Sequence, residues 1–503
     1  MYYPAHMARI DPPGDASFAT GTRLFVAALA FAHAAAFLSI WTQSAGLIGP
    51  SGILPATRFF AAAREQIGAR AWFEAPSLCW LFGAGRFIDV LCGLGLALSI
   101  LLLLGIAPAV CLALLWACYL SLVSAGQIFF DFQWDNLLLE STLVAIFLVP
   151  WKLGRVTGRF EPPRLARYLA WWLLFRLMFF SGLVKLASGD PAWRHLTALT
   201  VHYQTQPLPT PLAWYAHQLP AWFQRISCAV MFAIELAAPF CIPAPRAVRH
   251  AGALALAALQ VAIALTGNYA FFNLLSLGLC LTCLDDAWWR RLRLWSPRPG
   301  ADAGPVPSPA PRSKAAALRW FAALSVGVTF FVAVAGVYRG AAASPLVQAV
   351  EETVGPLRSF NTYGLFAVMT PERPELIFEG SNDRQDWREY GFPYKPGNLS
   401  RRPRWVAPYQ PRLDWQLWFA ALGPPDDSPW VGTVCERLLR GDPAVLGLLG
   451  ANPFPGRPPQ FVRVVRYKYE FTDALERART GNWWRRTPID FYIPAVSLPQ
   501  EPP

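Results

Sequence analysis

Five ionisable side chains interrupt two neighbouring stretches of sequence that are otherwise apolar enough to cross a membrane. They are Asp131, Asp135, Glu140, Arg176 and Lys185. The three acids lie in the stretch 128–149 and the two bases in the stretch 169–186. An ionisable group inside a bilayer is costly, so it usually pairs with another group or lines a cavity. These residues are therefore candidates for an intramembrane polar site.

The short loop between the two stretches predicts an antiparallel pair of helices. With the turn centred near Gly158, Glu140 lies opposite Arg176. The same register sets Asp131 opposite Lys185. Two pairs of opposite charge at matched depths would either fix the helix register or form a polar site or proton path entered from outside. The residues alone leave both interpretations open.

The composition predicts the membrane bundle that would hold these charges. The 503-residue chain is 54% hydrophobic and 15% charged, whereas soluble globular proteins carry about 25% charged residues. A helical span needs about 20 mainly apolar residues. Candidate spans cover residues 22–41, 87–104, 107–124, 128–149, 169–186, 222–242, 250–266, 270–284 and 318–337. The stretch 54–83 is expected to be interfacial or re-entrant. The predicted fold class is an α-helical polytopic membrane bundle of about 8–10 spans, followed by a C-terminal mixed α+β extramembrane domain containing an antiparallel sheet.

Clusters of Lys and Arg predict the orientation of the bundle, because such residues collect on the cytoplasmic side. Basic clusters occur at 152–167 and 290–319, and a short turn holds Arg246 and Arg249. The proposed spans place all three on one face, which we expect to be cytoplasmic. The predicted domains are therefore 1–342, a multi-span transmembrane domain with a Pro-rich cytoplasmic linker near 285–316, and 343–503, an outer C-terminal domain.

The net charge of +12 does not indicate nucleic-acid binding. Through residue 350 the chain has 25 Lys and Arg against 14 Asp and Glu, but the remainder has 19 against 18. The excess of basic residues thus belongs to the membrane part. We expect the lipid bilayer as a partner and exclude nucleic acid.

The loop after the stretch 169–186 concentrates polar side chains at the predicted outer membrane surface. Prolines restrict its backbone, which suits a binding surface. The candidates are Asp190, Trp193, His202, Tyr203 and Gln206. No Cys or third His lies at metal-ligand spacing from the two histidines of this loop, and no nucleophile elbow is recognisable. We therefore predict no metal, no cofactor and no catalytic residue.

The last 150 or so residues are long enough for one domain with its own core. Residues 375–380 and 387–392 predict a hairpin, 460–471 predicts a half-exposed strand, and 413–422 and 434–439 predict helices. Aromatic residues alternate with arginines, a combination that dominates protein-interface hot spots. An ordinary aromatic core beneath an arginine-rich surface is the alternative. Of nine cysteines only Cys435 lies here, so the domain must be stabilised by packing.

Several long motifs resemble the lipase maturation factor family, and specifically a bacterial-type member. They are GQIFFDFQWDNLLLE (126–140), the stretch 176–223 with GDPAW and HYQTQPLP, NTYGLF (361–366), WREYGFPYKPG (387–397), RRPRWVAPYQPRLDWQLWFAAL (401–422), NPF (452–454) and YKYEF (467–471). The resemblance adds binding candidates in the outer domain: Asn361, Tyr363, Arg401, Arg402, Asp414, Trp415, Asn452 and Tyr467.

The resemblance implies a non-enzymatic, chaperone-like membrane protein that helps exported lipases reach their active state. It implies the endoplasmic reticulum membrane in a eukaryote and the inner membrane in a bacterium, and the Ala, Pro and Arg bias favours the latter. The alternative is a membrane enzyme similar in architecture to the vitamin K-dependent carboxylase-like proteins. That enzyme would need a cavity joining Glu140, Arg176 and Lys185 to Asp190 or His202. A transporter is less favoured, because the sequence lacks repeated halves.

Overall fold

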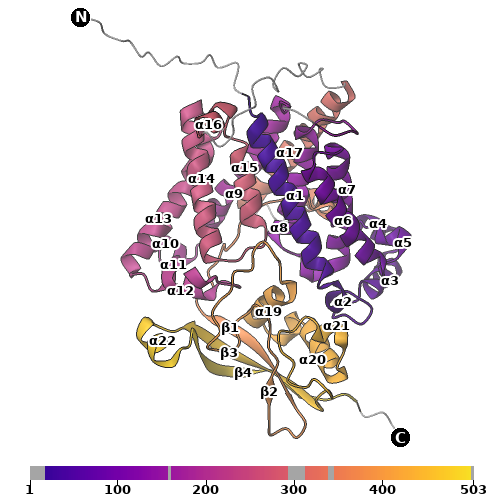
Figure 1. Cartoon of the computed structure of the whole chain (residues 1–503), viewed down its shortest axis with the longest axis vertical. Coiled ribbons are helices and arrows are strands. Elements are labelled where there is room, and N and C mark those ends of the chain that lie inside the picture. The colour runs from indigo at the N-terminus through magenta and orange to yellow at the C-terminus, as the bar shows by residue number, and fades with distance from the viewer. Residues whose placement is uncertain (1–16, 157–159, 293–311, 338–344, 500–503) are drawn as a thin grey trace, which may run out of the picture.

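The fold is described by a computed structural model of residues 17–156, 160–292, 312–337 and 345–499. The predicted turn centre near Gly158, most of the predicted linker and the predicted domain boundary at 342 and 343 lie outside these residues. Figure 1 shows a helical bundle with a smaller domain of helices and strands at one end. The predicted fold class is confirmed.

Helices build the bundle, and each predicted span overlaps one of them, although the helix within the predicted span 128–149 has 16 residues and is not among those apolar enough to cross a membrane. The helices of the bundle are α1 (Ala19–Trp41), α6 (Phe87–Leu103), α7 (Pro108–Gly126), α8 (Gln133–Leu148), α9 (Arg164–Ala187), α13 (Ala221–Ala237), α14 (Arg246–Thr266), α15 (Phe272–Leu281) and α17 (Arg312–Val337). Within the described residues, six helical segments are long and apolar enough to span a membrane: α1, α7 with η2 (Gln127–Phe130), α9, α13 with η3 (Ala238–Cys241), α14 and α17. The helices α6 and α15 are shorter but also apolar.

Shorter helices lie between the long ones. The stretch expected not to span the membrane forms α3 (Ala56–Ile67), η1 (Gly68–Arg70), α4 (Ala71–Glu74) and α5 (Cys79–Phe82), after α2 (Ser44–Leu47). The loop after α9 forms α10 (Pro191–Arg194), α11 (Ala198–Thr205) and α12 (Pro211–His217). Proline opens α10 and α12, where the missing N–H costs no hydrogen bond. The remaining short helices are α16 (Asp286–Arg291), α18 (Pro345–Val354) and η4 (Gly355–Leu357).

Helix α16, which carries Arg290 and Arg291, lies at the end of the bundle opposite the smaller domain (Figure 1). There Asp285 accepts from Arg246 at 2.8 Å and lies 3.5 Å from Arg249. Both arginines belong to the first turn of α14, and Arg167 lies in the first turn of α9. The guanidinium groups of Arg167 and Arg249 both lie over the ring of Phe18. The first turns of α9 and α14 thus lie close together, beside the start of α16.

The smaller domain contains an antiparallel sheet with strand order β2-β1-β3-β4. Its strands are β1 (Arg373–Ser381), β2 (Arg388–Glu389), β3 (Phe461–Phe471) and β4 (Trp484–Val496). Its helices are α19 (Arg412–Leu422), η5 (Pro425–Asp427), α20 (Trp430–Arg440), α21 (Pro443–Leu446) and α22 (Ala474–Thr480). The predicted hairpin is present, with Glu379 paired to Glu389, although its second strand is only two residues long. Strand β4 was not predicted, because Pro488 and Pro494 interrupt its pattern.

One continuous apolar core joins the bundle to the sheet. It runs from Leu29 in α1 through Trp134 in α8 to Trp415 in α19 and Leu376 in β1. Helix α19 therefore lies between the membrane helices and one face of the sheet. The apolar face of β3, with Val462 and Val464, packs on the same side. The smaller domain is consequently docked on the bundle by a buried apolar surface, which positions the polar clusters described next.

Candidate functional site

A first polar cluster lies in the contact between the bundle and the C-terminal domain, around Asp135 of α8. Arg412, the first residue of α19, donates from its two terminal nitrogens to the two carboxylate oxygens of Asp135 at 3.0 and 2.9 Å. Tyr119 of α7 also donates to Asp135. The side chains of Arg412 and Asp135 are 0% exposed, and the guanidinium lies 3.5 Å from the ring centre of Phe130. A bidentate pair fixes orientation as well as distance, so it locks α19 against α8.

A second cluster surrounds Glu140, and it contains the predicted pair with Arg176. The other oxygen of Glu140 accepts from the hydroxyl of Tyr363 at 2.7 Å and from the amide of Asn361 at 3.0 Å. Arg176 also donates to the carbonyl of Asn361 at 2.7 Å. Two residues of the C-terminal part thus complete the coordination of an intramembrane ion pair. Asn361 and Tyr363, expected in a binding surface of the outer domain, are structural partners of the bundle here.

The predicted pairing of Asp131 with Lys185 is wrong. Helix α8 begins only at Gln133, after the 3-10 turn η2, so Asp131 is not in helical register with α9. Its side chain is 69% exposed and lies 3.2 Å from Arg358. Lys185 instead pairs with Glu235 of α13 at 2.9 Å, and both side chains are buried. The acid opposite Lys185 therefore comes from a different helix.

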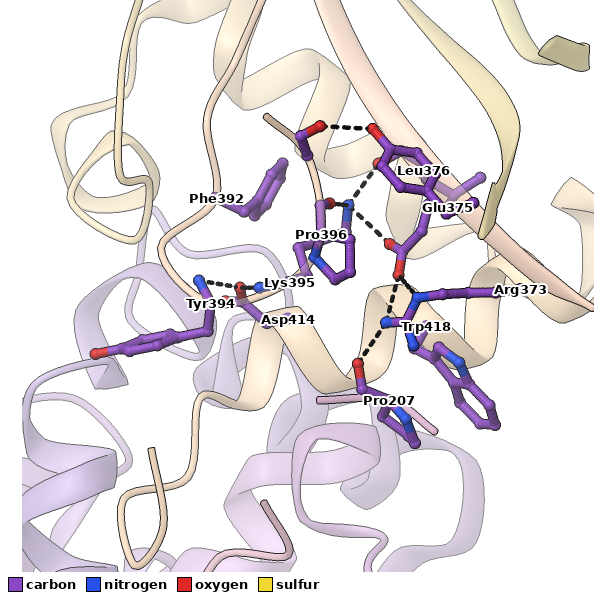
Figure 2. A network of polar contacts seen from close by, with 12 residues as sticks. Pro207, Arg373, Glu375, Leu376, Phe392, Tyr394, Lys395, Pro396, Asp414 and Trp418 are labelled. Carbon is purple, nitrogen blue, oxygen red and sulfur yellow. Dashed lines mark hydrogen bonds and ion pairs between the residues drawn. The ribbon is translucent and has the colours of Figure 1, made fainter. Parts of the chain in front are cut away.

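A third cluster fixes the start of the sheet to the loop between α11 and α12 (Figure 2). Arg373 donates to the carbonyls of Gln204 at 2.8 Å and Pro207 at 2.6 Å, and also to that of Gln206. It pairs with Glu375 at 2.7 Å, and Glu375 pairs with Lys395 at 2.9 Å. All three charged side chains are buried. The cluster joins three segments that are far apart in the sequence.

Asp414 lies beside this cluster and holds the loop that carries Lys395 (Figure 2). One of its oxygens accepts from the backbone N–H of Tyr394 at 2.9 Å and of Lys395 at 2.7 Å. Burial raises the pKa of Asp414 to about 6, although these hydrogen bonds and the nearby cations oppose the shift. Asp414 is buried and holds the backbone of Tyr394 and Lys395, while its binding role stays a prediction.

Three of the predicted outer-loop candidates, Asp190, Trp193 and His202, contact the segment 364–373. Asp190 caps α10 and accepts from the backbone N–H of Met369 at 2.6 Å. Trp193 donates from its indole to the carbonyl of Phe366 at 3.0 Å. His202 lies 3.2 Å from the hydroxyl of Tyr269, which donates to Gln206 at 2.7 Å. Burial first, and then the charge of Lys185, lower the pKa of His202 to about 4, so the imidazole is neutral at pH 7.

The remaining candidates divide between core and surface. Trp415 is buried and packs edge-on against Trp134 with ring centres 4.7 Å apart. Arg401 donates to the carbonyl of Phe392 at 2.5 Å, and Asn452 accepts from the N–H of Phe454 within its own turn. Other candidates reach the surface: Tyr203 and Tyr467 are half-buried, and Arg402 is exposed. The candidates therefore do not form one site.

Sequence analysis missed Arg373, Glu375, Lys395 and Arg412 as members of these clusters. Lys395 and Arg412 lie within 387–397 and 401–422, two stretches that carry the family resemblance, so these motifs could have pointed to them. Their acidic partners were not predictable, because they lie far away in the sequence. The partner of Arg412, for example, is Asp135. No rule of local spacing connects them.

Each of the three clusters pairs its charges internally, and a polar site at Glu140 and Arg176 stays a prediction. Both oxygens of Glu140 and of Asp135 accept hydrogen bonds from side chains of their own cluster. Each acid is matched by a buried base, as buried charges require. Among the described residues no three His, Cys, Asp or Glu side chains lie close enough to hold a metal, and all nine cysteines are free thiols.

A separate cavity lies inside the bundle between α9, α13 and α14. Its volume is about 260 Å³. Lys185, Glu235, His202 and Tyr269 line it, and Phe366 forms part of its wall. It does not reach Glu140 or Arg176, so the cavity required for the alternative enzyme is only partly present.

Comparison with known proteins places both parts of the chain. The model of the family described as "Lipase maturation factor transmembrane domain" matches residues 20–291, and that described as "Lipase maturation factor C-terminal domain" matches residues 359–494. Lipase maturation factor 2 of Mus musculus is 36% identical over 591 residues, covering 95% of this chain and 83% of the relative. Its Homo sapiens counterpart is 36% identical, covering 95% and 82%. Lipase maturation factor 1 of Mus musculus is 34% identical over 523 residues, covering 98% and 90%. No solved structure matches.

Proposed function

The chain belongs to the lipase maturation factor family, and we propose that it is a membrane-anchored maturation factor for exported lipases or other exported clients. In this role it acts without catalysis, as a chaperone-like platform. The observation that carries the proposal is the rigid docking of the C-terminal domain on the bundle by three buried polar clusters and a shared core. Such docking leaves part of one face of the sheet and the edge of β4 to contact a client.

The exposed face of the sheet carries aromatic and arginine side chains, which we call the outer patch: Trp387, Arg463, Tyr467, Arg486 and Phe491. Arg463 lies 4.0 Å from the ring centre of Trp387 and 5.3 Å from that of Phe491. Arg486 lies 4.4 Å from the ring centre of Tyr467. The side chain of Phe491 is 61% exposed. Clustered aromatic and arginine residues are typical of binding hot spots.

Strand β4 supplies the second element of the platform. It pairs with β3 on one side, and within the described residues no strand covers its other edge. A free edge can add an extended segment of a partly folded partner by backbone hydrogen bonds. Pro488 and Pro494 interrupt the row of donors along β4, which limits pairing between copies of this chain. The platform therefore suits a client that still exposes apolar side chains and extended backbone.

We propose the same domain division and orientation for the chain in its membrane. The C-terminal domain lies outside the cytoplasm, because helix α16 is at the opposite end of the bundle (Figure 1) and carries Arg290 and Arg291 beside the basic first turns of α9 and α14. In a bacterium, as the Ala, Pro and Arg content favours, the bundle lies in the inner membrane and the domain in the periplasm. In a eukaryotic cell the equivalent places are the endoplasmic reticulum membrane and its lumen.

The test is the specific activity of a secreted lipase co-expressed with the full chain. Phe491→Asp combined with Trp387→Ala is expected to lower that activity about ten-fold or more while lipase synthesis is unchanged. The matched control is Leu475→Asp on α22, where the side chain is 77% exposed and outside the outer patch. Normal lipase activity with the double variant, at normal levels of the folded variant, would show that the outer patch is not needed for lipase maturation.

A further inference from the structure

The cavity between α9, α13 and α14 lies at the end of the bundle that carries the C-terminal domain. On α14 its lining residues run from Leu259 to Thr266, which are the last two turns of that helix. On α9 they run from Leu177 to Lys185, close to the end of that helix at Ala187. Leu365 and Phe366 form the wall toward the C-terminal domain. The cavity is therefore within the membrane helices and covered from the domain side.

Phe366 is held in this wall by an unusual backbone conformation. Its φ of 55° lies in the left-handed region, which bulky residues rarely adopt. The indole of Trp193 donates to its carbonyl, and its ring packs edge-on against His202 with centres 4.8 Å apart. These contacts fix the side chain beside the polar groups of the cavity. The wall is thus built by specific contacts and is not a chance gap between helices.

The polar groups of the cavity carry no net charge. The ammonium of Lys185 donates to both oxygens of Glu235, at 3.0 and 2.9 Å, and to the carbonyl of Ser181 at 2.9 Å. All three of its donors are thereby used. His202 is neutral because burial lowers its pKa to about 4. An anion in the cavity would therefore meet no unpaired cation.

Neutral hydrogen-bonding groups lie beside this balanced pair. The side-chain carbonyl of Gln260 accepts from Asn273 at 2.8 Å, while its amide nitrogen has only a weak contact at 3.5 Å with the sulfur of Met178. Gln260, His202 and Tyr269 all line the cavity. The other walls are mainly aliphatic or aromatic. A ligand for this cavity must therefore offer an uncharged hydrogen-bonding end and an apolar body.

The cavity lining includes partly exposed residues of α13 and α14, which we call its mouth, on the side that we expect to face lipid. Its lining residues on α13 and α14 include Met231, Ile263 and Thr266, which are half-buried, and Ala262, which is exposed. Neighbouring side chains such as Val230 and Leu265 are exposed and apolar. Both helices belong to segments long and apolar enough to span a membrane. A molecule dissolved in the bilayer can thus enter between them without crossing water.

We propose that this cavity binds the uncharged polar end of a single-chain lipid, of the monoacylglycerol type, that enters from the bilayer between α13 and α14. A group of water size occupies about 30 Å³, so a cavity of about 260 Å³ holds the glycerol end and the first carbons. The rest of the chain passes through the mouth into the membrane. This ligand site does not depend on client binding.

The test uses the full chain in phosphatidylcholine nanodiscs and a monoacylglycerol with a diazirine in its acyl chain. Photolysis is expected to give saturable labelling, mapped by mass spectrometry to peptides of α9, α13 or α14. Unlabelled monoacylglycerol should reduce labelling at least ten-fold, and the fatty acid of the same chain length at pH 8 should not. Labelling that does not saturate, or equal competition by the carboxylate, would overturn the proposal.

Occluding variants identify the cavity as the site. Ile263→Trp fills it, and Ala262→Trp blocks its mouth from an exposed position that needs no repacking of the core. Each is expected to reduce labelling at least ten-fold. Leu265→Trp, on the lipid-facing side of the same helix, should leave labelling unchanged. Equal labelling of Ala262→Trp and Leu265→Trp, in protein that elutes and melts like the parent, would show general lipid contact and contradict the proposal.

Discussion

At the scale of single residues, buried charges hold the two parts of the molecule together. The pair of Arg412 with Asp135 joins α19 directly to α8. The pair of Arg176 with Glu140 lies within the bundle, and Arg176 also donates to the carbonyl of Asn361 in the C-terminal part. Removing one partner of a buried pair leaves an uncompensated charge and costs about 3–5 kcal/mol. The stability of the whole chain is therefore expected to depend on the predicted site residues Asp135, Glu140 and Arg176, and on Arg412, which was not predicted.

Asp135→Asn is expected to destabilise the protein by about 3 kcal/mol, because the bidentate pair with buried Arg412 is lost. Asp131→Asn, four residues away, is the matched control. Its pair with Arg358 is exposed, and exposed pairs contribute about 0–1 kcal/mol. Thermal unfolding of the purified protein in detergent measures both. Equal melting temperatures for the two variants would contradict the structural role of Asp135.

Asp414 gives a prediction for pH. Burial raises its pKa to about 6 in the folded protein, whereas an unfolded Asp titrates near 3.9. The folded state therefore binds the proton more tightly, so this contribution to stability is present below about pH 4 and is lost as the pH rises through 6. Asp414→Asn keeps an acceptor for the two backbone N–H groups and removes the titration.

The comparison is the melting temperature of the parent and of Asp414→Asn at pH 4.5 and pH 7.5. On acidification the free energy of unfolding, obtained from the melting curves, should rise by about 1–3 kcal/mol more in the parent than in the variant. Other carboxylates titrate in both proteins, and their effect cancels in the difference. A larger gain in the variant would mean that Asp414 is charged and stabilising at neutral pH.

At the scale of elements, the segment 359–373 connects the bundle to the sheet by threading between α9 and the loop after it. Gly364 marks its tightest contact, because an added Cβ would lie 2.8 Å from one methyl of Val184. Gly364→Ala should therefore loosen this segment and increase its cleavage in limited proteolysis. Val184→Ala removes the methyl and should restore resistance in the double variant. Unchanged resistance of Gly364→Ala alone would show that the segment is not held there.

Elements with a clear apolar period were predictable from sequence, and elements set by tertiary contact were not. The membrane helices and β3 follow from apolar length and alternation. Strand β4 was missed because its two prolines are typical of an edge and hide its length. The pair of Glu140 with Arg176 followed from antiparallel register, while that of Asp131 with Lys185 failed where the helix was interrupted at η2. Glu235 belongs to a later helix, and no local pattern links it to Lys185.

At the scale of the whole molecule, helix α16, which carries Arg290 and Arg291, and the C-terminal domain lie at opposite ends of the bundle (Figure 1). One new cysteine, placed at exposed Arg291 of α16 or at exposed Arg402 of the domain, reports its side of the membrane in a Cys241→Ser background, where the other eight cysteines are buried. An impermeant maleimide added from outside intact cells or spheroplasts should label the cysteine at 402 and not that at 291. Labelling only at 291 would invert the orientation and remove the client platform.

The central claim is that the outer patch contacts an exported lipase during its maturation. The most direct measurement is photo-crosslinking in intact cells with a photoreactive amino acid placed at Phe491 or, as control, at Leu475. We expect a crosslink to newly made lipase from position 491 that disappears as the lipase becomes active, and none from position 475. Crosslinks of equal yield from both positions, or from neither while the lipase still requires this protein, would contradict it.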